Sequence, residues 1–163
     1  MNSQDALRNA FAIMCAFSLF ASAAALAQSV YSGGHAHMLT PEQLVWSDAP
    51  SVGKGAKIAV IEGPLNQAVP FLFRLKLPAN TKVAPHTHPT YERVTVLSGV
   101  FYFAHGENYD ENKVRALPAG SVAIMPPGTP MFGYTKEDTV IQLNGTGPWG
   151  LQYLNPADDP RKK

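Results

Sequence analysis

The chain has 163 residues, of which 45% are hydrophobic and 15% are charged, so it has the composition of one folded globular domain and not of a disordered chain. The formal net charge is +1, and the basic residues form no stripe along the sequence. We therefore expect no nucleic-acid partner, because such a partner requires a concentrated basic surface.

Residues 1–27 have the features of an export signal. Arg8 lies in a polar stretch, residues 10–25 carry no charge, and Ala25-Leu26-Ala27 has the small-x-small form that signal peptidase recognises. The alternative is a buried N-terminal helix; the uncharged run is shorter than the roughly 20 residues that span a bilayer. We expect cleavage before Gln28, which predicts a periplasmic or secreted bacterial protein with no membrane association after cleavage.

Cys15, the only cysteine, lies inside this signal segment. The mature chain would therefore contain no disulfide and no thiolate. Any metal ligand in it must be nitrogen, oxygen or thioether.

Residues 28–55 are interpreted as an N-terminal arm with one short helix. The arm is rich in Ser, Gly and His up to about Thr40, and Thr40-Pro41-Glu42-Gln43 has the N-cap, N1 proline and N3 glutamine of a helix start. His35 and His37 lie in the loose part with no carboxylate near them in the sequence. We interpret these two histidines as solvated, with adventitious metal binding as the alternative.

Residues 56–156 contain short apolar runs separated by Gly-rich and Pro-rich turns, and no long segment of helical period. This pattern predicts an all-β sandwich or barrel. Residues 157–163 are expected to form a charged tail. The expected strands are 57–62, 69–77, 91–97, 100–105, 114–117, 122–125, 131–134, 139–143 and 149–154.

Three potential metal ligands occur at even spacings. His86 and His88 are two residues apart, so on a strand their side chains point to the same face. Glu92 follows after four more residues and can return to that face. Two imidazoles and one carboxylate on one wall form a facial ligand set with open positions opposite.

The spacing of these residues resembles the first motif of the cupin superfamily, G-x5-H-x-H-x3-4-E-x6-G. Asn80 stands in place of the opening glycine, and His86, His88, Glu92 and Gly99 follow at the expected intervals. Asparagine is a mild departure, because it tolerates the left-handed backbone that glycine provides in a turn.

The second cupin motif, G-x5-P-x-G-x2-H-x3-N, is matched only at its turn residues. Gly120, Pro126 and Gly128 are present, whereas Met131 and Thr135 replace the histidine and the asparagine. The chain most resembles small exported bacterial cupin-domain proteins. The resemblance implies a single double-stranded β-helix, or jelly-roll, barrel over residues 56–156.

The resemblance also implies that His86, His88 and Glu92 hold one divalent transition metal ion, which could be Zn, Mn, Fe, Ni or Cu. Met131 stands in the position of the fourth ligand of the family. Three alternatives remain at this point: an ion held by three ligands with Met131 nearby, thioether ligation by Met131, which suits copper, or no metal.

Aromatic residues alternate along several of the expected strands, and most of them are expected to form the barrel core. Phe101, Phe103, Tyr134 and Gln142 are candidates to line a pocket next to the metal.

Two functions remain open. The first is a metal-dependent oxygenase or isomerase that acts on a small molecule; no catalytic residue beyond the metal ligands can be named. The alternative is a non-catalytic module that binds a small ligand or a metal, or acts as a sensor, with a degenerate site. The sequence leaves open whether the protein is an enzyme. The resemblance also implies a possible homodimer.

Overall fold

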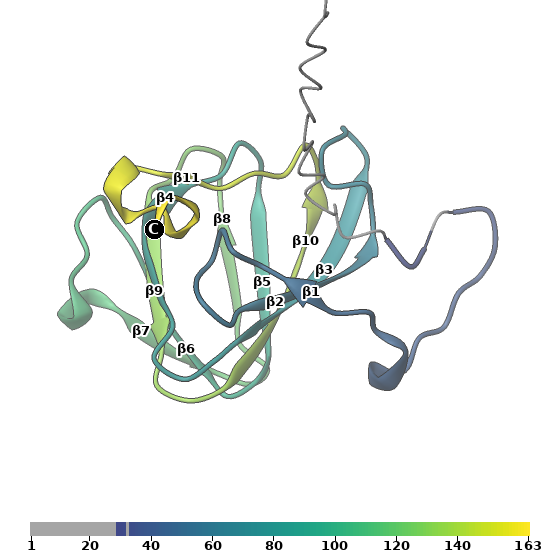
Figure 1. Cartoon of the computed structure of the whole chain (residues 1–163), viewed down its shortest axis with the longest axis horizontal. Coiled ribbons are helices and arrows are strands. Elements are labelled where there is room, and N and C mark those ends of the chain that lie inside the picture. Colours follow the sequence, from purple (N-terminus) through teal and green to yellow (C-terminus); the bar gives the residue numbers. More distant parts are fainter. Residues whose placement is uncertain (1–28, 32) are drawn as a thin grey trace, which may run out of the picture.

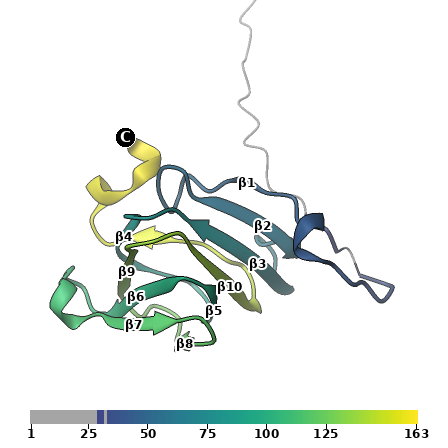
Figure 2. The ribbon, with the colours of Figure 1, turned by 90° about the horizontal axis from the view of Figure 1, so that it is seen from below.

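The computed structural model describes residues 29–31 and 33–163, so the predicted signal peptide lies outside the described residues. The chain forms two antiparallel sheets that face each other (Figures 1 and 2). The strands are β1 (Ser47–Asp48), β2 (Lys57–Glu62), β3 (Pro70–Leu77), β4 (Lys82–Thr87), β5 (Glu92–Ser98), β6 (Val100–His105), β7 (Arg115–Pro118), β8 (Val122–Met125), β9 (Met131–Thr135), β10 (Thr139–Thr146) and β11 (Gln152–Tyr153).

The strand order shows a jelly roll. The six-stranded sheet has the order β1-β2-β3-β10-β5-β8, and the five-stranded sheet has the order β11-β4-β9-β6-β7. The chain crosses from one sheet to the other between β3 and β4, between β4 and β5, and between β5 and β6. The double-stranded β-helix predicted from the sequence is therefore confirmed.

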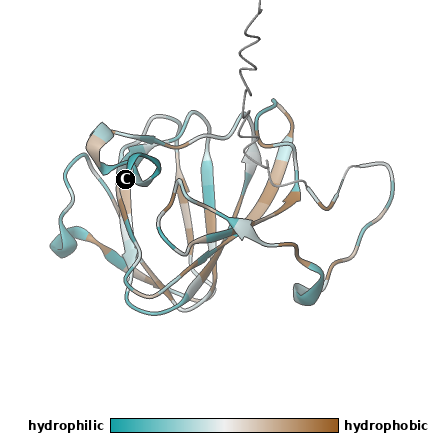
Figure 3. Cartoon of the chain, viewed as in Figure 1, coloured by the Kyte–Doolittle hydropathy of each residue, from teal (hydrophilic) through white to brown (hydrophobic). Residues whose placement is uncertain are grey.

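The core lies between the sheets because the strands alternate apolar and polar residues with a period of two. On β3, Phe71, Phe73, Leu75 and Leu77 are buried, while the residues between them point outward. Figure 3 shows the hydrophobic colour concentrated on the strands, whereas the loops are mostly hydrophilic.

Most of the predicted strands are present, and β2, β6 and β8 have the predicted bounds. Two strands, β1 and β4, were not expected. The sequence of β4 has no apolar alternation and contains Pro85, which has no N–H to donate to a ladder. The pairing of β4 with β9 shifts register between Val83 and His86, which accommodates this proline.

Both ends of the described chain contact the barrel. The N–H groups of Val30 and Tyr31 donate to the carbonyls of Val60 and Ile61 on β2. Beyond Tyr31 the arm extends away from the barrel (Figure 1) and carries the predicted helical turn, η1 (Pro41–Gln43).

The predicted tail forms two short 3-10 turns, η3 (Pro156–Asp158) and η4 (Pro160–Lys162). Asp159 between them is buried and accepts a hydrogen bond from Nε of Arg161 at 2.7 Å. Another 3-10 turn, η2 (Glu111–Lys113), precedes β7. Across residues 29–31 and 33–163, no helix has the length and apolar character needed to cross a membrane.

Candidate metal centre

The three predicted ligands lie close together, but they come from both sheets. His86 is on β4 in the five-stranded sheet, Glu92 begins β5 in the six-stranded sheet, and His88 lies in the turn between them. The expectation that all three lie on one wall is therefore wrong. Pro89 follows β4 and helps to end it, so the chain crosses the barrel before Glu92.

All three side chains are buried, with exposed fractions of 4% for His86, 3% for His88 and 6% for Glu92. The imidazole rings of His86 and His88 are 4.9 Å apart between centroids and nearly perpendicular, at 82°. Their positions are set by backbone segments that pass behind the rings.

Each imidazole is oriented through its Nδ1 atom. Nδ1 of His86 is 2.7 Å from the carbonyl oxygen of Ala84, and Nδ1 of His88 is 2.5 Å from that of Gly150. A carbonyl can only accept, so each Nδ1 carries the hydrogen and donates it. The Nε2 lone pair of each ring is then left for another partner, which is the arrangement used by metal-binding histidines.

Two buried polar atoms in the centre have no hydrogen-bond partner: Nε2 of His88 and Oε2 of Glu92. Nε2 of His88 lies 3.7 Å from Oε1 of Glu92, which is too long for a hydrogen bond. Buried polar groups are normally paired, and a bound cation or a proton would supply the partner that each of these two atoms lacks. The donor set of His88 and Glu92 therefore fits a divalent ion.

The fit with all three ligands requires some movement. Within the part of the chain that the structure describes, no three His, Cys, Asp or Glu side chains already surround one point that could hold a metal. Binding through His86 as well as His88 and Glu92 thus needs a side-chain adjustment toward a common centre.

Burial sets the protonation of the centre. It lowers the pKa of His86 to about 4, and burial together with the neighbouring His86 lowers the pKa of His88 to about 3. Burial raises the pKa of Glu92 to about 8. At neutral pH both imidazoles are therefore in the neutral form that binds metal, whereas Glu92 must release a proton to become a ligand.

Trp149 is part of the centre although the sequence analysis did not identify it as a site residue. Its ring stacks on that of His88, with centroids 4.1 Å apart and an interplanar angle of 19°. The backbone N–H of Trp149 donates to the carbonyl of Leu65 at 2.6 Å, which fixes this loop. No local pattern predicts this contact, because it joins residues far apart in the sequence.

Met131, which the resemblance places at the position of a fourth ligand, lies beside His86. It starts β9 and is the cross-strand partner of His86 on β4, so the two side chains leave the sheet on the same face. Met131 has an exposed fraction of 0% and belongs to the hydrophobic core. His105, its partner on β6, is exposed and offers no replacement ligand within the barrel.

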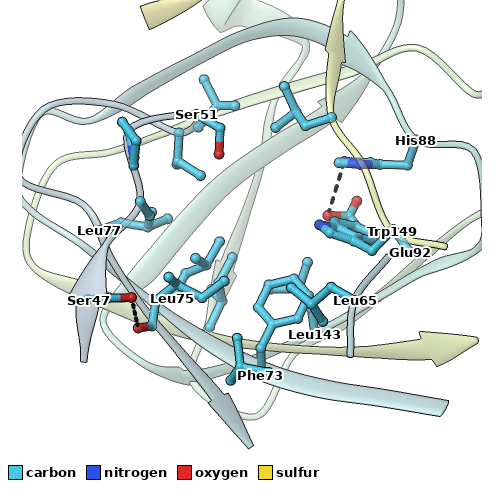
Figure 4. A pocket seen from close by; sticks show the side chains of 18 of the residues that line it. Ser47, Ser51, Leu65, Phe73, Leu75, Leu77, His88, Glu92, Leu143 and Trp149 are labelled. Atoms are coloured by element: carbon cyan, nitrogen blue, oxygen red, sulfur yellow. Dashed lines mark hydrogen bonds and ion pairs between the residues drawn. The ribbon is translucent and has the colours of Figure 1, made fainter. Parts of the chain in front are cut away.

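The ligands open into a cavity of about 650 Å³ between the two sheets (Figure 4). Phe101 and Phe103 on β6 line this cavity. The other two pocket candidates lie elsewhere. Tyr134 stacks on Tyr102 outside the five-stranded sheet, with centroids 4.8 Å apart.

Gln142, on the outer face of β10, accepts a hydrogen bond from Nε of Arg74 at 3.0 Å. The strand period explains both errors. Tyr102, the partner of Tyr134, lies between two inward residues of β6, and Gln142 lies between the buried residues Ile141 and Leu143 of β10.

No protein-family model and no curated protein matches the chain. Solved structures match it at low identity. The polyketide cyclase RemF from Streptomyces resistomycificus has a TM-score of 0.65 at 14% identity, with 78% of this chain and 92% of that chain covered.

A putative acetylacetone dioxygenase from Methylibium petroleiphilum PM1 has a TM-score of 0.60 at 13% identity, covering 80% of this chain and 89% of that chain. An RmlC-like cupin from Ralstonia eutropha JMP134 has a TM-score of 0.58 at 18% identity, covering 77% of this chain and 76% of that chain. The chain therefore has the fold of the cupin superfamily.

Proposed function

We propose that this protein is exported, binds one divalent transition metal ion through His86, His88 and Glu92, and acts on a small molecule in the adjoining cavity as an oxygenase or isomerase. The observation that carries the proposal is the pair of orphaned acceptors, Nε2 of His88 and Oε2 of Glu92, buried at the wall of a largely apolar cavity. A divalent cation satisfies both atoms at once.

The residues around the ligands prepare them for this role. The carbonyls of Ala84 and Gly150 hold the rings in the tautomer that exposes Nε2. Trp149 covers one face of His88 and keeps water from it. When bound, the ion supplies a Lewis acid with open coordination positions.

Two of the similar structures are named as enzymes, a polyketide cyclase and a putative acetylacetone dioxygenase. Their names support a catalytic use of the cavity. Identities of 14% and 13% are too low to transfer either reaction to this chain.

A second candidate is a non-catalytic module that binds a metal or a small ligand. Met131 favours it, because a buried apolar side chain occupies the place of the family's fourth ligand. Turnover of a candidate substrate by the metal-loaded protein would support the enzyme. Saturable binding without turnover would support the module.

The experiment that tests the proposal is elemental analysis of the full chain, purified without an affinity tag. We compare it with a His86→Ala/His88→Ala variant and with a matched control, His35→Ala/His37→Ala, which removes the exposed histidine pair of the arm. We expect about one equivalent of metal in the parent and the control and none in the site variant. The absence of metal from all three proteins after reconstitution would refute metal binding.

A further inference from the structure

The cavity walls carry no positive charge among the residues that the structure describes: neither Lys nor Arg is part of the lining. The only acidic residues in the lining are Asp48 and Glu92. Asp48 belongs to the rim, where its side chain is 79% exposed and forms an ion pair with Lys57 at 2.6 Å. Inside the cavity, Glu92 is therefore the only acidic side chain.

The cations of the adjacent strand point away from the cavity. On β3, Arg74 and Lys76 alternate with the wall residues Phe73 and Leu75. Nε of Arg74 donates to Gln142 on the outer face, and Nζ of Lys76 lies 4.0 Å from the centroid of the Trp46 ring. The alternation of the strand thus keeps both cations outside the barrel.

The buried polar side chains of the cavity lining are His86, His88 and Glu92. The other polar residues of the lining are half-buried or exposed: Ser29, Ser47, Asp48, Ser51 and Asn66. Figure 4 shows His88 and Glu92 together with Trp149 at one side, Leu77 with Ser47 and Ser51 across the cavity, and Phe73 and Leu143 along the wall. Phe73 and Leu143 are each about 1% exposed. A molecule in this space meets the buried ionisable groups at one end and mostly hydrocarbon along the rest of its length, where Ser47 and Ser51 offer only uncharged hydroxyl groups.

This arrangement selects against charge. A charged group of a ligand that moves from water into an apolar site without a partner loses its hydration and gains no compensating interaction. A divalent metal ion bound by two neutral imidazoles and one carboxylate would keep one net positive charge. It could bind one polar or anionic atom of the ligand, but only at the end of the cavity where these three side chains lie. A second charge on the ligand would remain unpaired against the wall.

We propose that the cavity takes a predominantly apolar molecule with a single polar end directed at His88 and Glu92, and that it rejects molecules charged at more than one point. This inference rests on the proposed function in one respect only, the metal ion at the polar end of the cavity. The selectivity for apolar molecules comes from the cavity walls and is expected with or without metal.

The test uses Trp149 as a reporter of the cavity. The sequence contains two tryptophans, so Trp46→Phe leaves Trp149 as the only indole. The probes are 1-adamantanol, which is uncharged with one polar group, and 1,3-adamantanedicarboxylate, which has the same cage and two charges. Both are titrated into the full chain in EDTA and after metal loading, and the metal content of each sample is measured.

We expect 1-adamantanol to shift the emission of Trp149 saturably in both states, and the dicarboxylate to bind at least tenfold more weakly. Val83→Phe fills the cavity from β4 and should weaken binding of the alcohol at least tenfold, while Val122→Phe on the exposed face of β8 should not. Leu65→Phe, at a half-buried lining position, is the second occluding variant if Val83→Phe does not fold.

The outcomes separate the two proposals. Equal or tighter binding of the dicarboxylate, lost in the occluding variant, overturns the inference and leaves metal binding intact. Failure of the alcohol to bind in either state, or binding that both occluding variants leave unchanged, also overturns it. Binding of the alcohol by a chain that takes up no metal supports the inference and refutes the metal part of the proposed function.

Discussion

Glu92 is a carboxyl group enclosed between two sheets, and its surroundings decide whether it acts as an acid or a ligand. Burial raises its pKa to about 8, whereas burial lowers the pKa values of His86 and His88 to about 4 and about 3. The same apolar environment thus disfavours charge on all three groups.

These pKa values predict how the stability of the metal-free protein depends on pH. From about pH 4 to pH 6.5 the unfolded chain binds protons at two imidazoles that stay neutral in the folded chain, so the free energy of unfolding rises with pH. Glu92 acts in the opposite direction from pH 4.5 to about pH 8, because its folded form keeps the proton. Because the two imidazoles outweigh the one carboxyl group, we expect the free energy of unfolding to reach a maximum near pH 6.5.

The measurement is urea unfolding in EDTA from pH 4 to pH 9. Glu92→Gln should remove the decline above pH 6.5 and leave the rise below it, since glutamine does not titrate. A decline of the same size in this variant would show that another group causes it.

The side chain at position 131 provides a prediction about metal affinity. Met131→His places an imidazole opposite His86, and we expect metal affinity to increase by roughly tenfold or more if the side chain reaches the ion. Met131→Leu conserves volume and removes the thioether. We expect its metal affinity to stay within about twofold of the parent, measured by competition with a chelator; a large loss would identify the sulfur as a ligand.

The sequence predicted the three ligand candidates because their spacing is local information. It could not place Trp149 or the carbonyl of Gly150 behind His88, because these contacts depend on how distant loops meet. Tyr134 and Gln142 were misassigned because alternation gives the period of a strand and not which residues face inward.

Among the elements, β4 shows the limit of pattern reading. It was missed because Pro85 interrupts it, yet it carries His86 and pairs with both β9 and β11. Its strand conformation is imposed by its neighbours. Apart from the two-residue β1, the other strands were predicted because each contains a short apolar run that ends at a turn.

Two of the turns provide a matched pair of glycines. Gly99 between β5 and β6 has φ +73°, and a Cβ there would lie 2.6 Å from the carbonyl oxygen of Asp138 and 2.6 Å from Oγ1 of Thr139. Gly120 between β7 and β8 has φ +88° with nothing within 4 Å of its Cβ position. Both turns need a left-handed residue, but only the first also excludes a side chain.

We therefore expect Gly120→Ala to cost about 1–2 kcal/mol in the free energy of unfolding, from backbone strain alone. Gly99→Ala should cost about 1–3 kcal/mol more, because the methyl group meets backbone that cannot move aside. Urea unfolding of both variants in the presence of EDTA provides the comparison. Equal losses would mean that the β5–β6 turn relaxes around the methyl group.

At the scale of the whole molecule, metal binding should appear as thermal stability. A ligand that binds only the folded state at 100 times its Kd adds about 2.7 kcal/mol. We expect a chelator to lower the Tm of the loaded protein by several degrees and to have no effect on the His86→Ala/His88→Ala variant. If the chelator leaves the Tm of the metal-loaded protein unchanged, the ion does not stabilise the barrel and is not bound at the buried centre.

Export of the protein and its self-association are two further properties that stay predictions. Mass spectrometry of the protein from a bacterial periplasm should give an N-terminus at Gln28. Analytical ultracentrifugation measures whether the homodimer implied by the resemblance forms.

The crossing of the chain between β4 and β5 has a mechanical consequence. Because His86 belongs to one sheet and Glu92 to the other, an ion bound by both side chains would cross-link the two sheets. Opening of the barrel by separation of its layers would then require dissociation of the ion. Amide hydrogen exchange in β4 and β5 should slow together on metal binding, and the edge strand β1, which pairs only with β2, should respond least.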